Sequence, residues 1–181
     1  MNILAQIIGL FAMGINIISY QFKKSRHVML CQLIGSALFA VNMLMLGAVM
    51  GGILNAVGIF RAYAYILANE RNWNRKYLNW GFILVYLLSY GFSFAVIGTE
   101  PTTANLLTEI LPLIGMTSMT IGFSSGNAKT IRICGFINSP CWLTYNCINF
   151  SIGGILCEVI SLVSAFTAFL RLDAKNKKTH S

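Results

Sequence analysis

Seven long apolar stretches, separated by short polar segments, make up most of the chain. Each has close to the roughly 20 residues that a helix needs to cross the hydrocarbon of a bilayer. They lack the polar alternation of barrel strands, and a helix satisfies its own backbone hydrogen bonds in lipid. The stretches cover residues 3–20, 28–46, 48–68, 78–98, 104–123, 131–150 and 153–170. The pattern predicts an all-α integral membrane protein with seven transmembrane helices.

Lys and Arg residues occupy every second connection between these stretches. They are Lys23, Lys24 and Arg26 after the first span, Arg71, Arg75 and Lys76 after the third, Lys129 and Arg132 after the fifth, and Arg171, Lys175, Lys177 and Lys178 after the seventh. The connections at Gly47, 99–103 and 151–152 contain neither residue type. Because basic loops stay in the cytoplasm, we expect the N-terminus outside and the C-terminus inside.

Composition agrees with a membrane protein and narrows the functional classes. Hydrophobic residues make up 56% of the chain and charged residues only 10%, with a mean hydropathy of +0.70. The net charge of +8 follows from the loop asymmetry, so we expect the lipid bilayer as a partner and no nucleic acid. The first span lacks a basic leader region, and we expect it to remain in the mature protein. The sequence does not decide whether the protein forms a dimer or a trimer.

Metal, cofactor and catalytic signatures are missing from the sequence. The five cysteines lie inside the spans without a C-x-x-C pair, which indicates neither a disulfide framework nor a zinc site. The two histidines, His27 and His180, lie in a loop and in the tail, and no nucleophile–base pair is evident. We therefore expect no cofactor, no metal and no enzymatic activity.

A shift of 103 residues places spans one to three over spans five to seven. Matches include Leu10 with Leu113, Met13 with Met116, Ile34 with Ile137, Ser36 with Ser139, Phe39 with Trp142, Gly51 with Gly154 and Ala62 with Ala165. Three helices per copy plus one linking helix give both copies the same orientation. The interpretation is two parallel three-helix bundles: residues 1–68, a basic loop and linker helix over 69–103, a second repeat over 104–172, and a basic cytoplasmic tail over 173–181.

Polar and aromatic residues follow one side of the sixth span. Asn138, Trp142, Tyr145 and Asn149 recur at i, i+4, i+7 and i+11, with Asn146 at the edge of the stripe. Polar groups are costly in lipid and face the bundle interior or a water-filled cavity. The stripe could bind the polar and apolar faces of a small solute. The alternative is helix packing with interhelical hydrogen bonds.

Two acidic residues lie within the predicted spans and occupy related places in the repeat. Glu109 superposes on Gln6 and Glu158 on Asn55, and Asn55 and Glu158 each lie on a face of otherwise small residues. Such faces permit close helix contact, which is the structural explanation, or line a narrow path. The spacing of 16 residues from Phe39 to Asn55 recurs from Trp142 to Glu158. We expect the second repeat to carry most of the site.

Three further residues in the spans have simpler interpretations. For Arg61, snorkelling to the interface or an ion pair with a carboxylate is favoured over solute binding. Pro112 superposes on Gly9, and either residue could loosen its helix as a hinge, although Pro and Gly are common in membrane helices.

The chain resembles the YgjV-type bacterial inner-membrane proteins over nearly its whole length. The resemblance rests on residues 53–56, 111–115, 141–146 and 151–154 and on Glu158. The three-plus-one-plus-three plan is similar to that of the SWEET and semiSWEET sugar facilitators, other PQ-loop proteins, PnuC-type transporters and the KDEL receptor. The resemblance implies an aromatic residue of a second helix, Trp142, and an Asn of a third helix, Asn55, in a central site, with Phe39 and Glu158 as their repeat partners. No Pro-Gln pair occurs in the first helix of either repeat, and Glu158 replaces a neutral Asn, so a cationic or proton-coupled solute becomes conceivable.

The leading functional hypothesis is a SWEET-like transporter of a small polar solute, such as a sugar, nucleoside or vitamin-like compound. It would work in the bacterial inner membrane by alternating access and without ATP, since no ATP-binding motif is present. Its solute site would consist of Phe39, Asn55, Glu109, Asn138, Trp142, Tyr145, Asn146 and Glu158. The alternative is a membrane receptor or accessory subunit on the same plan.

Overall fold

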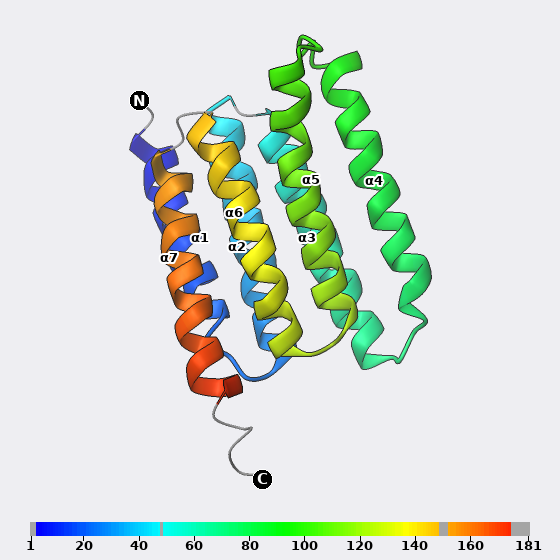
Figure 1. The fold of residues 1–181 in the computed structure, drawn as a ribbon, viewed down its shortest axis with the longest axis vertical. Coiled ribbons are helices and arrows are strands. Elements are labelled where there is room, and N and C mark those ends of the chain that lie inside the picture. The colour runs from blue at the N-terminus through cyan, green and yellow to red at the C-terminus, as the bar shows by residue number, and fades with distance from the viewer. Residues whose placement is uncertain (1–2, 48, 149–151, 175–181) are drawn as a thin grey trace.

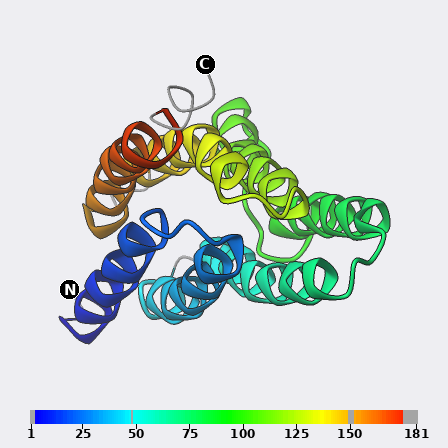
Figure 2. The ribbon, with the colours of Figure 1, turned by 90° about the horizontal axis from the view of Figure 1, so that it is seen from below.

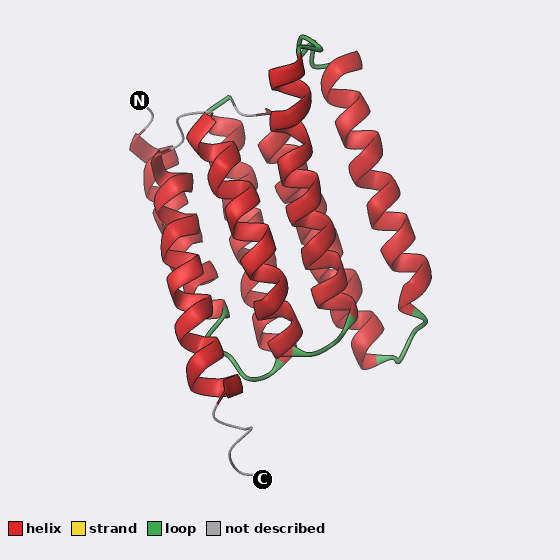
Figure 3. Ribbon diagram, in the orientation of Figure 1, coloured by secondary structure: helices red, strands yellow, loops and turns green. Residues whose placement is uncertain are grey.

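A computed structural model describes residues 3–47, 49–148 and 152–174 of the chain. These residues form seven α-helices and one π-helical segment, and none of them forms a β-strand (Figure 3). The helices are α1 (Ile3–Ser19), α2 (Ser25–Met45), α3 (Val49–Glu70), α4 (Arg75–Ala95), α5 (Thr103–Ser124), α6 (Ala128–Ile148) and α7 (Ile152–Ala168), followed by η1 (Phe169–Ala174). The predicted all-α class and the seven helices are confirmed.

Five of the helical segments are long and apolar enough to cross a membrane by length and composition. They are α2, α3, α4, α5 and the segment Gly153–Arg171, which covers most of α7 and the beginning of η1. The apolar helix α1 is shorter, at 17 residues. Helix α6 is the least apolar of the seven because Lys129, Arg132 and several amide and hydroxyl side chains interrupt it. Of the seven predicted spans, five are therefore confirmed as long and apolar enough to cross a membrane.

The helices lie in two rows. In one row α2 packs between α1 and α3, and in the other α6 packs between α5 and α7. Figure 2 shows the rows side by side, with α1 against α7 at one edge and α3 against α5 at the other. Helix α4 packs on α3 and α5 and closes that edge. The interior of the bundle lies between α2 and α6. These two helices contact each other much less than they contact the neighbouring helices of their own rows.

Odd-numbered helices run in one direction and even-numbered helices in the other (Figure 1). The connections 20–24, 71–74 and 125–127 therefore lie together at the end of the molecule where η1 ends. Two buried or half-buried arginines tie this end together by donating to carbonyl groups at the end of a helix or in the connection after it. Nη1 of Arg132 donates to the Phe22 oxygen at 2.9 Å, and Nη1 of Arg75 donates to the Ser124 oxygen at 2.8 Å. Cations are favoured at helix C-termini, where carbonyl groups lack partners.

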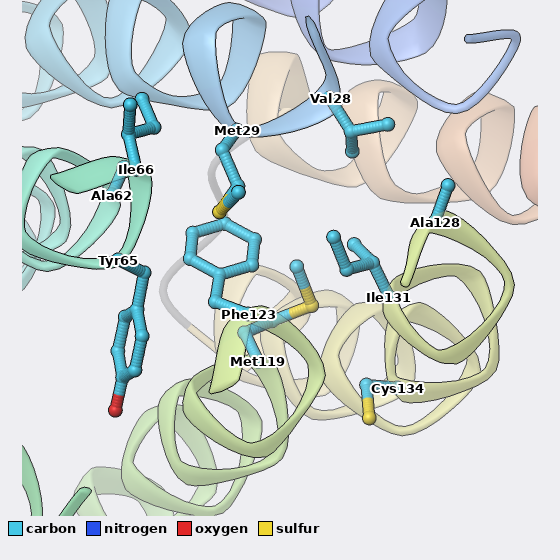
Figure 4. Packing of buried hydrophobic residues seen from close by; sticks show 10 residues of the cluster. All are labelled: Val28, Met29, Ala62, Tyr65, Ile66, Met119, Phe123, Ala128, Ile131 and Cys134. Atoms are coloured by element: carbon cyan, nitrogen blue, oxygen red, sulfur yellow. The ribbon is translucent and has the colours of Figure 1, made fainter. Parts of the chain in front are cut away.

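A cluster of buried apolar side chains fills the interior at the same end (Figure 4). The Phe123 ring packs edge-on to Tyr65, with their centroids 6.3 Å apart. Helices α2, α3, α5 and α6 all contribute, through Val28, Met29, Ala62, Tyr65, Ile66, Met119, Phe123, Ala128, Ile131 and Cys134. The cluster holds the two rows together on the side of the basic connections.

Candidate functional site

A cavity of about 70 Å³ lies between the two rows of helices. Its wall consists of Asn16, Tyr20, Gln32, Ser36, Phe39, Met43, Asn55 and Arg61 from one row, and Met116, Met119, Asn138, Trp142, Asn146, Gly154, Cys157, Glu158 and Ser161 from the other. Because a buried water needs only about 10–15 Å³ by the corresponding measure, the space suffices for several waters or a very small solute. The two rows contribute almost equally to this cavity, whereas the sequence favoured a site carried mostly by the second repeat.

Six of the eight residues proposed from the sequence line this cavity. They are Phe39, Asn55, Asn138, Trp142, Asn146 and Glu158. Four helices supply them: α2, α3, α6 and α7. The wall thus combines aromatic, amide and carboxyl groups, which could stack against and hydrogen-bond a polar solute.

Tyr145 and Glu109 do not line the cavity. Tyr145 is buried in an apolar cluster with Leu113 and Tyr86, outside the cavity wall. Glu109 is half-buried in α5 and interacts electrostatically with Tyr145. Its Oε2 is buried and has no hydrogen-bond partner among the described residues. These two residues therefore form a separate polar contact between α5 and α6.

The face of α6 that meets the cavity differs from the predicted stripe. Asn138, Trp142 and Asn146 line the cavity at i, i+4 and i+8, whereas the prediction continued through Tyr145 and Asn149. Tyr145 instead turns toward the cluster shared with α3, α4 and α5, and its ring lies edge-on to Trp142 at 5.7 Å. Asn149 lies outside the described residues.

Residues related by the 103-residue shift line the same cavity from the two rows. Four such pairs line it: Asn16 with Met119, Phe39 with Trp142, Met43 with Asn146, and Asn55 with Glu158. Contacts between the rows show the same relation. Helix α1 packs on α7, and their counterparts in the other repeat, α5 and α3, also pack on each other. Eight of the seventeen wall residues therefore occupy matching positions in the two repeats.

Asparagine side chains in the wall lie against glycines of neighbouring helices. A Cβ added to Gly154 of α7 would lie 2.5 Å from Asn146 Cγ, and one added to Gly115 of α5 would lie 3.0 Å from Asn138 Oδ1. Asn146 is only 3% exposed, and its Oδ1 has no hydrogen-bond partner among the described residues. A buried amide oxygen without a partner is costly, so Asn146 is a candidate to bind a donor in the cavity.

Arg61 corrects an expectation from the sequence. Its side chain is 4% exposed, so it does not snorkel to the surface, and no described carboxylate pairs with it. Nη1 instead donates to the Met116 carbonyl oxygen at 3.0 Å and to the Tyr86 hydroxyl at 3.3 Å. The guanidinium also lies 5.0 Å from the centroid of the Phe123 ring. Its length lets Arg61 reach the cavity wall although its position on α3 points away from Asn55.

Glu158 lies on the opposite side of the cavity from these contacts. Its half-buried side chain lies beside the Ser139 hydroxyl of α6 and near Tyr20, just after α1. The ion pair found among the described residues joins two exposed side chains, Arg26 and Glu70, at 3.0 Å. Glu158 and Arg61 thus share a cavity without forming an ion pair.

Several wall residues were not proposed from the sequence. Gln32, Ser36 and Met43 recur on α2 together with the already proposed Phe39 at i, i+4, i+7 and i+11, and Asn16 and Tyr20 lie four apart at the end of the first span. The α2 spacing is the same as that of the stripe recognised in the sixth span. A search for that spacing in both repeats would have found these residues.

The two predicted hinge positions lie within continuous helices. Pro112 is buried in α5, which runs through it from Thr103 to Ser124. Gly9 in α1 allows close approach of Asn42, because an added Cβ would lie 3.0 Å from Asn42 Nδ2. That amide donates to the Ala5 carbonyl oxygen at 2.7 Å. Gly9 therefore has a packing role, and motion at either position stays a prediction.

Comparison with known proteins places the chain in one family. The model of the Imp-YgjV family, described as a bacterial inner membrane protein, matches residues 3–176. Neither the curated proteins nor the solved structures contain a significant match to the chain. The match spans all seven helices and both walls of the cavity.

Proposed function

The chain belongs to the Imp-YgjV family of bacterial inner membrane proteins, and from that premise we propose that it carries a small polar solute across this membrane. It is a multi-pass protein of the inner membrane. The proposed movement is alternating access without ATP, with the basic connections in the cytoplasm and the N-terminus outside.

One observation carries the proposal: the central cavity is lined by four repeat-related pairs of residues. Transporters built from internal repeats bind solutes near the bilayer midplane, where the repeats meet. The pair Phe39 and Trp142 offers aromatic surface, and the pair Asn55 and Glu158 offers polar groups. The resemblance to sugar facilitators supports the same arrangement. Sugars, nucleosides, vitamin-like compounds and small cations are the solute classes to consider.

Alternating access requires the two rows to separate at one end and then at the other. The apolar cluster around Phe123 joins the rows on the side of the basic connections. Met119 belongs both to that cluster and to the cavity wall. Opening toward the cytoplasm would therefore part Met119 and Phe123 from Met29 and Tyr65, while the wall near Gly154 and Asn146 stays closed. The solute leaves chemically unchanged.

Uptake into proteoliposomes tests the proposal. The purified chain is reconstituted, and flux is measured for labelled sugars, nucleosides, vitamins, amines and amino acids under a solute gradient, with and without a proton gradient. Trp142→Ala should abolish flux of any accepted solute because it removes aromatic surface from the cavity wall. Trp80→Ala is the matched control, since Trp80 is on α4 and 64% exposed.

Two outcomes would contradict the proposal. Binding of a solute without flux under any gradient would favour a receptor or accessory subunit on the same helical plan. Equal loss of flux in Trp80→Ala and Trp142→Ala would show that the central cavity is not the path.

A further inference from the structure

Arg61 places a positive charge with unused donors at the cavity wall. All of its hydrogen bonds to described residues come from Nη1, to Tyr86, to the Met116 carbonyl and to the Met116 sulfur. Among the described residues, the buried Nε has no hydrogen-bond partner, and Nη2 makes no hydrogen bond either. A guanidinium carries five N–H donors in a fork that fits a carboxylate. Arg61 therefore retains donors for an acceptor that the described residues do not supply.

Neutral partners alone leave this charge uncompensated. The carbonyl, the hydroxyl and the Phe123 ring stabilise the guanidinium in part. A buried charge without an opposite charge nevertheless remains costly, and buried charges in proteins are generally paired. If Arg61 served only to join α3 to α4 and α5, a neutral donor would fulfil that role at lower cost. The charge thus points to an anionic group in the cavity.

Glu158 supplies an acidic group on the other side of the same cavity. Arg61 contacts α4 and α5, whereas Glu158 lies beside Ser139 of α6 and near Tyr20. Both residues line the cavity, yet they form no ion pair. The repeat places Ser164 opposite Arg61 and Asn55 opposite Glu158 in the alignment. Each ionisable group thus occurs once, in one repeat only, and the cavity has a basic and an acidic wall.

We infer that the cavity selects a small zwitterion, whose anionic group binds Arg61 and whose cationic group binds Glu158, an inference that rests on the proposed transport function. A solute with both charges would complete the pairing that the protein leaves open. The cavity volume of about 70 Å³ limits such a solute to a compact molecule, such as a short amino acid. The Asn146 Oδ1 atom, which has no hydrogen-bond partner among the described residues, offers one further acceptor in the wall.

Thermal unfolding of the full chain in detergent tests this inference with four probes that share a four-carbon chain. They are γ-aminobutyrate, butylamine, butyrate and butyramide, which are zwitterionic, cationic, anionic and neutral. A ligand that binds the folded state raises its apparent stability. The zwitterion should raise the unfolding midpoint at concentrations at least about tenfold lower than any of the other three, which corresponds to one additional charged contact of about 1.4 kcal/mol. Glycine, β-alanine and 5-aminovalerate vary the charge separation.

Two charge-removing variants assign the ends of the solute. In Glu158→Gln, the zwitterion should raise the unfolding midpoint no more effectively than butyrate does. In Arg61→Gln, it should do so no more effectively than butylamine. Arg26→Gln is the control, because Arg26 is exposed and pairs with Glu70 at the surface. If Arg61→Gln does not fold, Glu158→Gln together with the four-probe comparison decides the question.

The outcomes separate this inference from the proposed function. Equal responses to γ-aminobutyrate and butyramide, or a zwitterion response unchanged in Glu158→Gln, would overturn the zwitterion while leaving transport of a neutral solute intact. Flux of sugars or nucleosides without any response to the amino acid series would do the same. A selective zwitterion response without flux in proteoliposomes would support the ligand class and contradict transport.

Discussion

Gly154 of α7 lies so close to Asn146 of α6 that a Cβ at position 154 would lie 2.5 Å from Asn146 Cγ. The neighbouring Gly153 has no such contact, since its nearest atom would be Gln6 Oε1 at 3.4 Å. The glycine at 154 thus lets the Asn146 amide reach the cavity wall between two adjacent helices.

Gly154→Ala should lower the free energy of unfolding by roughly 1–3 kcal/mol, because the added methyl group overpacks this contact. Gly153→Ala should be neutral or should stabilise by up to about 1 kcal/mol, because Ala is the better helix former. Denaturant titration in detergent measures both. Combining Gly154→Ala with Asn146→Ala should recover much of the loss. Equal effects of the two glycine variants would contradict the close contact.

The Tyr86 hydroxyl joins three helices. It lies 2.9 Å from Thr120 Oγ1 of α5 and accepts from Arg61 Nη1 of α3 at 3.3 Å. Tyr86→Phe should destabilise the protein by about 0.6 kcal/mol, and by no more than about 2 kcal/mol, as measured for interhelical hydrogen bonds in membranes. A double-mutant cycle with Thr120→Val should show a coupling energy. Tyr63→Phe, at an exposed position, is the control and should have no effect.

Hydropathy was sufficient to predict the helices, because length and apolar content are properties of each segment alone. The charge pattern in the connections was visible for the same reason, and Figure 1 shows the basic connections together at one end. Helical phase was less reliable. It assigned Tyr145 to the cavity because Tyr145 shares a broad face with Trp142, but an aromatic ring of that size packs equally well in the cluster with Leu113 and Tyr86.

Arg61 shows why the remainder of the site was not predictable. Its role depends on which groups the neighbouring helices bring to it, namely the Met116 carbonyl and the Tyr86 hydroxyl. Those residues are 55 and 25 positions away in the sequence. A periodic pattern describes the face of one helix, whereas the hydrogen-bond partners of Arg61 depend on how three helices pack together. The stripe of Gln32 and Ser36 on α2, by contrast, was accessible from spacing alone.

Arg132 and Arg26 provide a comparison of a buried and an exposed arginine. Arg132 is 2% exposed and donates to the Phe22 carbonyl at 2.9 Å, whereas the Arg26 side chain is 64% exposed in its ion pair with Glu70. Arg132→Met should lower the free energy of unfolding by about 1.5–3 kcal/mol, the range for hydrogen bonds from charged groups. Arg26→Met should cost at most about 1 kcal/mol and less at high salt. Denaturant titrations at two salt concentrations distinguish the two, and a large, salt-independent loss in Arg26→Met would contradict a surface pair.

The orientation of the chain in the membrane can be tested at the two ends of the bundle. Lys24 lies in the connection between α1 and α2, and Glu100 lies in the connection between α4 and α5 at the opposite end (Figure 1). Lys24→Cys and Glu100→Cys are each introduced into a chain whose five cysteines are replaced by alanine, and intact cells and inverted vesicles are treated with a membrane-impermeant maleimide. Because basic connections remain cytoplasmic, Glu100→Cys should react in cells and Lys24→Cys only in inverted vesicles. The reverse pattern would place the N-terminus inside, and labelling of both sites from one side would contradict an arrangement in which these two connections lie on opposite faces of the membrane.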